Sequence, residues 1–137
     1  MSNVTIKLDN STIQKLAIFE SITKSSLKDC IDEDEEITFL INSNDLGKAI
    51  GKNAINIKTL QRKFNKKITL IGFDINPLQF ARNLFKPIPI KNITLEDNVL
   101  NIMINGSQRA FPSKKVKKAK MLLTKYFDNI KDVVVKV

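Results

Sequence analysis

The 137-residue chain has no histidine, no tryptophan and a single cysteine, Cys30. Histidine is the side chain that acts most often as a general base and binds metals most often, so its absence removes the usual catalytic and metal-binding groups. One cysteine excludes an internal disulfide and any metal site built from several cysteines. We therefore expect no catalytic residues, no metal and no cofactor, and we expect Cys30 to be a buried structural thiol.

Long hydrophobic runs are also missing from the chain. No apolar segment approaches the roughly 18 residues that a membrane-spanning helix needs. Residues 1–4 lack the charged and then apolar pattern of a secretory signal. We expect a soluble protein of the cytoplasm that does not bind membranes.

Acidic residues are scarce in the second half of the chain. Residues 1–74 contain 11 Lys or Arg and 10 Asp or Glu, whereas residues 75–137 contain 12 and 4. The net charge of +9 favours a polyanionic partner, because a basic surface attracts nucleic acid or anionic lipid. A basic surface that serves only solubility is the alternative.

A repeated order of helices and strands is present instead. In the first half, apolar spacing predicts strand, helix, strand, strand, short helix, helix and strand, over residues 4–8, 11–23, 27–31, 37–41, 44–49, 53–65 and 66–73. The second half predicts helix, strand, strand, helix and strand, over residues 77–85, 90–95, 99–104, 112–126 and 131–137. This repeat of about sixty residues predicts an α+β fold with two domains, residues 1–74 and 75–137.

A glycine turn lies directly before the amphipathic helix expected at residues 53–65. Gly51 can adopt backbone angles that are closed to other residues, and Asn53 is a residue type that often caps helix N-termini. The first turn of a helix has unpaired N–H groups and a partial positive charge, so a phosphate can bind there. Nearby positive charge comes from Lys48, Lys52 and Lys58.

The sequence around Gly51 resembles the loop of a KH domain. It reads Ile50-Gly51-Lys52-Asn53-Ala54, followed by Ile57 and Leu60, against the family pattern I-G-x-x-G-x-x-I-x-x-L. Ala54 replaces the second glycine, and this change can narrow the freedom of the backbone and so weaken or alter binding by the loop. Alanine is the least disruptive replacement, because it is small and forms helices best. The order of elements in each half also matches the type II KH fold, a three-stranded sheet with helices on one face. The resemblance therefore implies two tandem type II KH domains.

A KH loop clamps about four nucleotides of single-stranded RNA. The resemblance implies that the backbone amides of residues 51–54 hold the sugar-phosphate chain, while Ile50, Ile57 and the strand at 66–73 line an apolar groove for the bases. With no tryptophan and one tyrosine, the chain lacks the aromatic platform on which other RNA-binding folds stack bases. We expect most of its aromatic side chains in the core, namely Phe39, Phe64, Phe73, Phe85 and Phe111.

The second half has no G-x-x-G pattern and carries a lysine-rich helix instead. Each lysine that neutralises a phosphate adds affinity without reading sequence. We expect phosphate contacts, mostly from the exposed side of this helix, by Arg109, Lys114, Lys115, Lys117 and Lys118. A helix face that is merely solvated is the alternative.

Two tandem type II KH units, bridged by Asn83-Leu84-Phe85-Lys86-Pro87, resemble the archaeal NusA-like proteins. Membership of that family implies a transcription elongation or termination factor that binds nascent single-stranded RNA. RNA polymerase is a further candidate partner. We expect the protein to act as a monomer.

Two other functions stay open. A KH fold that has lost RNA affinity and serves as a protein-interaction adaptor is consistent with Ala54 and with the missing second loop. An enzyme acting on nucleic acid would need clustered carboxylates to bind metal. The acidic run at residues 32–36 is contiguous, so in a strand its side chains would alternate between faces.

Overall fold

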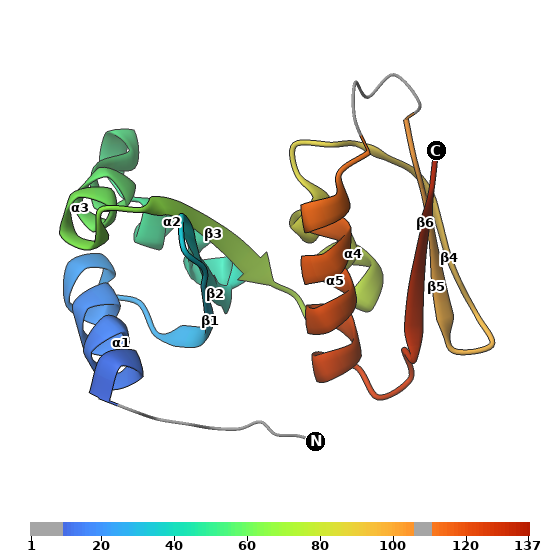
Figure 1. Cartoon of the computed structure of the whole chain (residues 1–137), viewed down its shortest axis with the longest axis horizontal. Helices are drawn as coiled ribbons and strands as arrows, with labels where there is room; N and C mark the ends of the chain where they lie inside the picture. The colour runs from blue at the N-terminus through green and yellow to red at the C-terminus, as the bar shows by residue number, and fades with distance from the viewer. Residues whose placement is uncertain (1–9, 106–110) are drawn as a thin grey trace. The chain divides into compact units, whose positions relative to one another are not determined.

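The computed structural model describes residues 10–105 and 111–137. The chain divides into two compact units, Met1–Phe73 (unit 1) and Asp74–Val137 (unit 2). The described residues form five α-helices and six β-strands (Figure 1), which is a mixed α+β fold. The strand expected at residues 4–8 lies outside the described residues, as does Arg109.

Unit 1 contains a three-stranded sheet with the order β1-β2-β3. β1 is antiparallel to β2, whereas β3 is parallel to β2. Because parallel neighbours need a crossover connection, the chain passes from β2 to β3 through two α-helices and two short 3₁₀ turns. The elements are α1 (Asn10–Thr23), β1 (Leu27–Asp32), β2 (Glu36–Asn42), η1 (Ser43–Asp45), α2 (Leu46–Ile50), η2 (Lys52–Ala54), α3 (Ile55–Phe64) and β3 (Lys67–Phe73).

The core of unit 1 lies between its helices and the sheet. Phe19 of α1, Ala49 of α2 and Leu60 of α3 are buried, together with the sheet residues Ile37, Phe39, Ile41 and Ile68. The ring centroids of Phe19 and Phe39 are 4.5 Å apart. Burial of aromatic rings contributes much of the stability of a small core, and here it joins α1 to β2.

Within its described residues, unit 2 repeats this topology with fewer elements. Its sheet has the order β4-β5-β6, with β4 antiparallel and β6 parallel to β5. Each sheet has a β-bulge in its first strand, between Leu27 and Asp29 in unit 1 and between Ile90 and Asn92 in unit 2, 63 residues later. The elements are α4 (Pro77–Phe85), β4 (Ile90–Glu96), β5 (Val99–Ile104), α5 (Ser113–Tyr126) and β6 (Asp132–Lys136).

The helices of unit 2 cover one face of its sheet (Figure 1). α4 begins with Pro77, and the side-chain oxygen of Asn76 accepts hydrogen bonds from the N–H groups of Leu78 and Gln79, at 2.9 and 3.3 Å. α4 contacts α5 and β4, and α5 also contacts β6. The fully or nearly fully buried residues include Phe80, Leu84, Phe85, Leu100, Ile102, Leu122 and Leu123.

The order of elements expected from the sequence is seen in the described residues of both halves. Phe39 and Phe85 are fully buried and Phe64 packs against the core of unit 1, as expected. Phe73 is half-buried, with Nζ of Lys28 4.2 Å from its ring centroid. The prediction that Phe111 belongs to the core is wrong. It is 46% exposed because it precedes α5 and so does not share that helix's buried face.

No helix within residues 10–105 and 111–137 combines the length and the hydropathy that a bilayer crossing requires.

Candidate nucleic-acid interface

The turn between α2 and α3 depends on Gly51. Its backbone angles are φ 79° and ψ 169°, and its N–H donates to the carbonyl oxygen of Gly47 at 3.1 Å. A Cβ on Gly51 would lie 2.8 Å from Nδ2 and 3.0 Å from Cγ of Asn56. Both the positive φ and this close approach require glycine, so the expectation for Gly51 is confirmed in its geometry.

The residues after Gly51 form a tight loop, η2, whose tip faces solvent. Two of the loop amides are used internally, because Ala54 N–H donates to the Gly51 carbonyl at 3.1 Å and Ile55 N–H donates to the Lys52 carbonyl. The amides of Lys52 and Asn53 have no hydrogen-bond partner among the described residues, and both residues are exposed. Of the amides of residues 51–54, these two are therefore the ones available to a ligand.

The expectation that Asn53 caps the following helix is wrong. Helix α3 begins at Ile55, and its N-cap is Ala54, which makes no side-chain cap hydrogen bond. Asn53 and Ala54 both have left-handed backbone angles, with φ of 55° and 59°. Asparagine tolerates this conformation better than other residues with a Cβ, which explains Asn53 at the tip.

Ala54 is also not a helical residue, so its helix propensity does not decide how well it replaces glycine. A left-handed conformation costs an L-residue with a Cβ about 1–2 kcal/mol, and glycine adopts it without that cost. The substitution of alanine for the second glycine of the KH pattern therefore leaves strain in the loop. The loop is held on both sides, because Ala49 of α2 and Leu60 of α3 are buried in the core of unit 1.

Asn56 is a residue of the loop that sequence reasoning missed. Its Nδ2 donates a hydrogen bond to the carbonyl oxygen of Lys48 at 3.3 Å, and its side chain passes beside the Cα of Gly51. It therefore ties the end of α2 to the first turn of α3. The signal in the sequence was an amide side chain that follows the glycine turn at the start of the helix.

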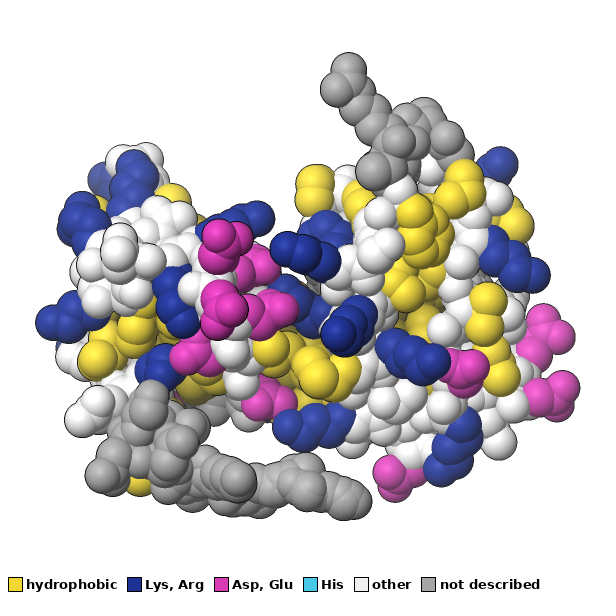
Figure 2. All heavy atoms as spheres, viewed as in Figure 1, with side chains coloured by type: hydrophobic (Ala, Val, Ile, Leu, Met, Phe, Trp, Pro, Cys, Tyr) yellow, Lys and Arg dark blue, Asp and Glu magenta, His cyan; other side chains and the backbone are white. Residues whose placement is uncertain are grey.

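Lysine and arginine side chains surround this loop. Lys48, Lys52 and Lys58 are exposed, as expected, and none has an ion-pair partner among the described residues. The last turn of α3, at the end of the helix away from the loop, adds Arg62 and Lys63, which were not among the expected residues. Figure 2 shows Lys and Arg side chains around α3 in unit 1. No acidic residue occurs between Lys48 and Lys67, so the local field favours an anion.

The apolar neighbours of the loop differ in part from those expected. Ile50 is half-buried beside the turn, whereas Ile57 packs against the core of unit 1. In the expected strand at 66–73, Ile68 and Ile71 are buried. Ile55, the first residue of α3, is 49% exposed, so it offers more apolar surface beside the loop than Ile57 does.

The cations of α5 in unit 2 do not form one uniform face. Lys114 and Lys117 are exposed, while Lys118 is half-buried. Nζ of Lys115 donates to the backbone carbonyl of Lys86 at 2.9 Å. Of the lysines expected to contact phosphate in this helix, Lys114 and Lys117 are therefore the most accessible.

Lys120 of α5 is engaged with β6. Its Nζ lies 2.9 Å from the carboxylate of Asp132. Hydrogen bonds from Lys120 and from the N–H of Val133 hold the pKa of Asp132 below its usual value. Lys120 thus links α5 to β6, and its ion pair with Asp132 weakens its attraction for an external anion.

The first residue of the acidic run, Asp32, pairs with a lysine of α1 and with the lysine that precedes β3. Asp32 accepts hydrogen bonds from Lys15 at 2.9 Å and Lys66 at 2.8 Å. Partial burial raises the pKa of Asp32, but these two lysines lower it by more, so it lies below the usual value. Among the described residues, no group of three or more His, Cys, Asp or Glu side chains could hold a metal ion.

Cys30 lies in β1 next to this cluster. It is half-buried and packs against the core of unit 1, which is more exposure than the expected full burial. Burial and the neighbouring Asp32 raise the pKa of its thiol to about 11. The thiol therefore stays protonated and unreactive at neutral pH.

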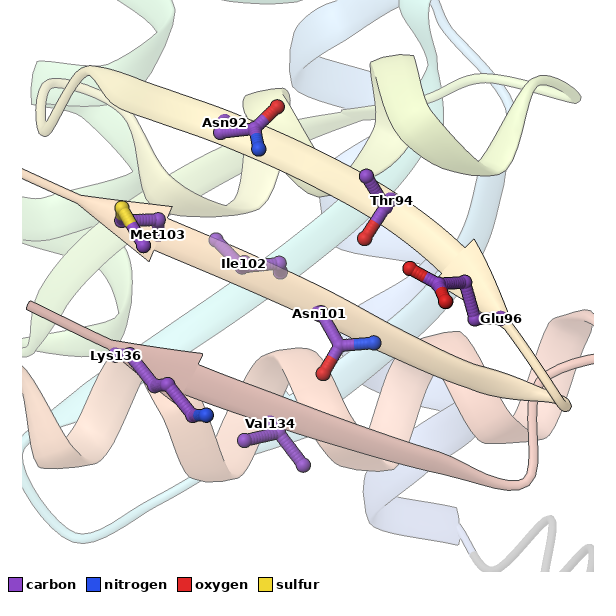
Figure 3. A pocket seen from close by; sticks show the side chains of 8 residues that line it. All are labelled: Asn92, Thr94, Glu96, Asn101, Ile102, Met103, Val134 and Lys136. Carbon is purple, nitrogen blue, oxygen red and sulfur yellow. The ribbon is translucent and has the colours of Figure 1, made fainter.

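The sheet of unit 2 has an open face with a shallow hollow of about 360 Å³. Figure 3 shows its lining side chains: Asn92, Thr94, Glu96, Asn101, Ile102, Met103, Val134 and Lys136. None of them is aromatic. This sheet face therefore lacks the groups on which RNA-binding sheets stack bases.

Comparison with known proteins shows similarity to archaeal proteins named probable transcription termination protein NusA. The chain is 34% identical over 108 residues to the protein of Methanocaldococcus jannaschii, covering 76% of this chain and 59% of that one. It is 38% identical over 88 residues to the protein of Methanococcus vannielii, covering 64% and 51%. The chain thus spans little more than half the length of these two relatives.

A relative of similar length is the Thermoplasma acidophilum protein of the same name. It is 27% identical over 139 residues, and the alignment covers 96% of this chain and 96% of that one. No family model matches the sequence. The crystal structure of APE1850 shares the fold, with a TM-score of 0.70 and 24% identity over 90% of this chain and 96% of that one. The named relatives support a NusA-like family.

Proposed function

From this similarity to NusA-like proteins, we propose that the chain is a transcription elongation or termination factor that binds nascent single-stranded RNA. In this proposal residues 1–74 form a type II KH domain with a working loop, and residues 75–137 form a degenerate one. The protein acts as a monomer, and RNA polymerase is its second candidate partner.

The single observation that carries the proposal is the pair of unpartnered amides at Lys52 and Asn53. Two adjacent N–H groups at the tip of a tight loop can donate to the oxygens of one phosphate. Positive charge near these amides comes from Lys48, Lys52 and Lys58. Hydrogen bonds to a charged phosphate are stronger than those to a neutral acceptor, so this loop would fix the backbone of the RNA.

The apolar contribution would come from Ile50 and Ile55 at the two ends of the loop. An unstacked base gains affinity from contact with apolar side chains, and aliphatic groups replace the aromatic ones of other RNA-binding folds. Lys114 and Lys117 of unit 2 would add charge without reading sequence. Unit 1 would thus hold the RNA, while unit 2 attracts it.

The direct test is a fluorescence titration with labelled oligouridine of about eight nucleotides, roughly twice the span of one KH loop. We expect the double variant Lys52→Asp, Asn53→Asp to raise Kd at least tenfold, because it removes the charge of Lys52 and places two carboxylates beside the amides, where they repel a phosphate. Asn129→Asp with Lys131→Asp, at exposed positions of unit 2, is the control because it makes the same change in net charge. Equal affinity of the double variant and the control would contradict the proposal.

The alternative is a KH-fold adaptor that binds protein and has weak or no affinity for RNA. It is favoured by the strain at Ala54 and by the engagement of Lys115 and Lys120 within unit 2. In that case oligouridine does not bind measurably, and the double variant changes nothing.

A further inference from the structure

Helix α1 is apolar on more than its buried face. Phe19 is fully buried and Ile22 packs against the core of unit 1. On another side of the helix, Ile13 is 50% exposed and Ala17 is exposed. These two residues lie four positions apart, in a row that Ser21 continues, so they face the same direction. A helix that only covers a core has polar residues there, which indicates a second surface that another molecule covers.

This row borders a groove between α1 and α3. The groove has a volume of about 440 Å³, and its lining residues are Ala17, Ile18, Ser21, Ile22, Thr59 and Lys63. Figure 2 shows hydrophobic side chains exposed between these two helices of unit 1. The volume falls within the range of about 300–1,000 Å³ typical of ligand sites, and the floor is aliphatic.

The rim of the groove is positively charged. Lys63 lines it, and Nη2 of Arg62 donates to Oγ1 of Thr59 at 3.5 Å, which holds the guanidinium beside the lining residues. No carboxylate lines the groove. The carboxylate of Glu20 in α1 accepts a hydrogen bond from the N–H of Leu27 at 3.1 Å. An occupant that complements this surface therefore combines aliphatic groups with negative charge.

We propose that the groove binds an amphipathic helical segment of another protein, whose aliphatic side chains fill it and whose acidic side chains face Arg62 and Lys63. Helices commonly bind grooves in this way, through apolar residues at i, i+3, i+4 and i+7. RNA fits less well, because the N–H groups in the middle of helices are already paired and leave no backbone donor for a phosphate. This site is separate from the Gly51 loop, so the inference does not depend on RNA binding.

The experiment uses the full chain and a fluorescent helical peptide of about 15 residues, long enough for helix formation. The peptide has leucine at i, i+3, i+4 and i+7 and glutamate on its other face, and a matched peptide has lysine in place of glutamate. We expect the glutamate peptide to bind and to shift the amide signals of Ala17, Ile18, Ile22 and Thr59 in NMR spectra. Binding that maps elsewhere, no binding, or equal affinity of the two peptides would overturn the inference.

Two variants with matched controls locate the contact. We expect Ala17→Glu and Lys63→Glu each to weaken the glutamate peptide at least tenfold, and Lys63→Glu also to improve binding of the lysine peptide. Met121→Glu and Lys131→Glu, at exposed positions of unit 2, should leave Kd within twofold. Ser21→Glu gives the same test should Ala17→Glu fail to fold. If Ala17→Glu weakens oligouridine while no peptide binds, the groove serves RNA and the inference is wrong.

Discussion

The two units share a sheet topology but differ in the connection between their parallel strands. Both sheets pair their first two strands as an antiparallel hairpin with a bulge near its start, and both add the third strand in parallel. In unit 1 the crossover contains α2, the Gly51 turn and α3, whereas in unit 2 the described part of it contains α5. In its described residues, unit 2 therefore forms the same sheet topology with a single helix in this connection. The loop of unit 1 is a feature added to that topology, which is where function is expected to lie.

The largest effect that sharpens this comparison is expected at Gly51. Gly51→Ala places a Cβ 2.8 Å from Nδ2 of Asn56, in a conformation that only glycine adopts readily. The unfolding free energy of unit 1 should therefore fall by about 1–3 kcal/mol. RNA affinity should fall as well. Gly47→Ala is the matched control, because a Cβ there meets nothing within 4 Å. Urea unfolding followed by residue-resolved NMR measures the stability of both variants, and oligouridine titration measures their RNA affinity. Equal effects of the two variants would mean that Gly51 is not special.

Ala54 should respond in the opposite direction. Ala54→Gly removes the strain of a left-handed alanine, so we expect a gain of about 0.5–1 kcal/mol in unfolding free energy after the entropy cost of glycine, together with tighter RNA binding. Ala119→Gly in the buried face of α5 should instead lose stability, since glycine disfavours helices by about 1 kcal/mol. Denaturant titration of both variants checks the sign. Destabilisation by both would show that Ala54 is not strained.

The pH dependence of stability should differ between Asp32 of unit 1 and Asp132 of unit 2. The folded pKa of Asp32 lies below its ordinary value of 3.8, so the unfolded state binds more protons near that pH, and stability is lost as pH falls through the folded pKa. Asp32→Asn should cost at most about 1 kcal/mol at neutral pH, as for other partly exposed ion pairs, and should cost less as the pH falls below about 4.

Asp132→Asn should follow the same trend more weakly, because the side chain of Asp132 is more exposed than that of Asp32, 46% against 33%, and pairs with one lysine rather than two. Thermal unfolding at a series of pH values provides the comparison. A cost for Asp32→Asn that stays constant to low pH would rule out the ion pairs as its cause.

The smallest effect concerns the charge of α5. Lys114→Gln with Lys117→Gln should lower the slope of log affinity against log salt by about 1.4, since each phosphate contact on a single strand contributes about 0.7. Lys115→Gln with Lys120→Gln should lower it less, because those side chains bind within unit 2. Titrations of oligouridine at several salt concentrations measure the slopes. Equal slopes for the two pairs would remove any special role of Lys114 and Lys117.

Much of the fold follows from local sequence pattern. The run Ile37-Thr38-Phe39-Leu40-Ile41 is apolar apart from one threonine, and it forms a strand that is buried at every one of these positions. Residues 99–104 alternate more, and β5 accordingly buries Leu100, Ile102 and Ile104 on one face. Asp97 and Asn98 form the turn before β5 with positive φ, as their residue types allow.

The details of the loop could not be predicted because they depend on contacts across the turn. Which amides remain unpaired is decided by the hydrogen bonds from Ala54 to Gly51 and from Ile55 to Lys52. The left-handed angles of Asn53 and Ala54 shorten α3 and remove the expected cap. The exposure of Ile55 and the role of Asn56 follow from the same geometry, which residue spacing alone does not contain.

The most direct measurement is an NMR titration of the ¹⁵N-labelled chain with short oligouridine. We expect the largest amide shifts at Lys52 and Asn53, whose N–H groups are unpartnered among the described residues, and smaller shifts at Gly51 and Ala54, whose N–H groups are already bonded. Shifts confined to α5, or none in the loop at saturating RNA, would contradict RNA binding by the Gly51 loop.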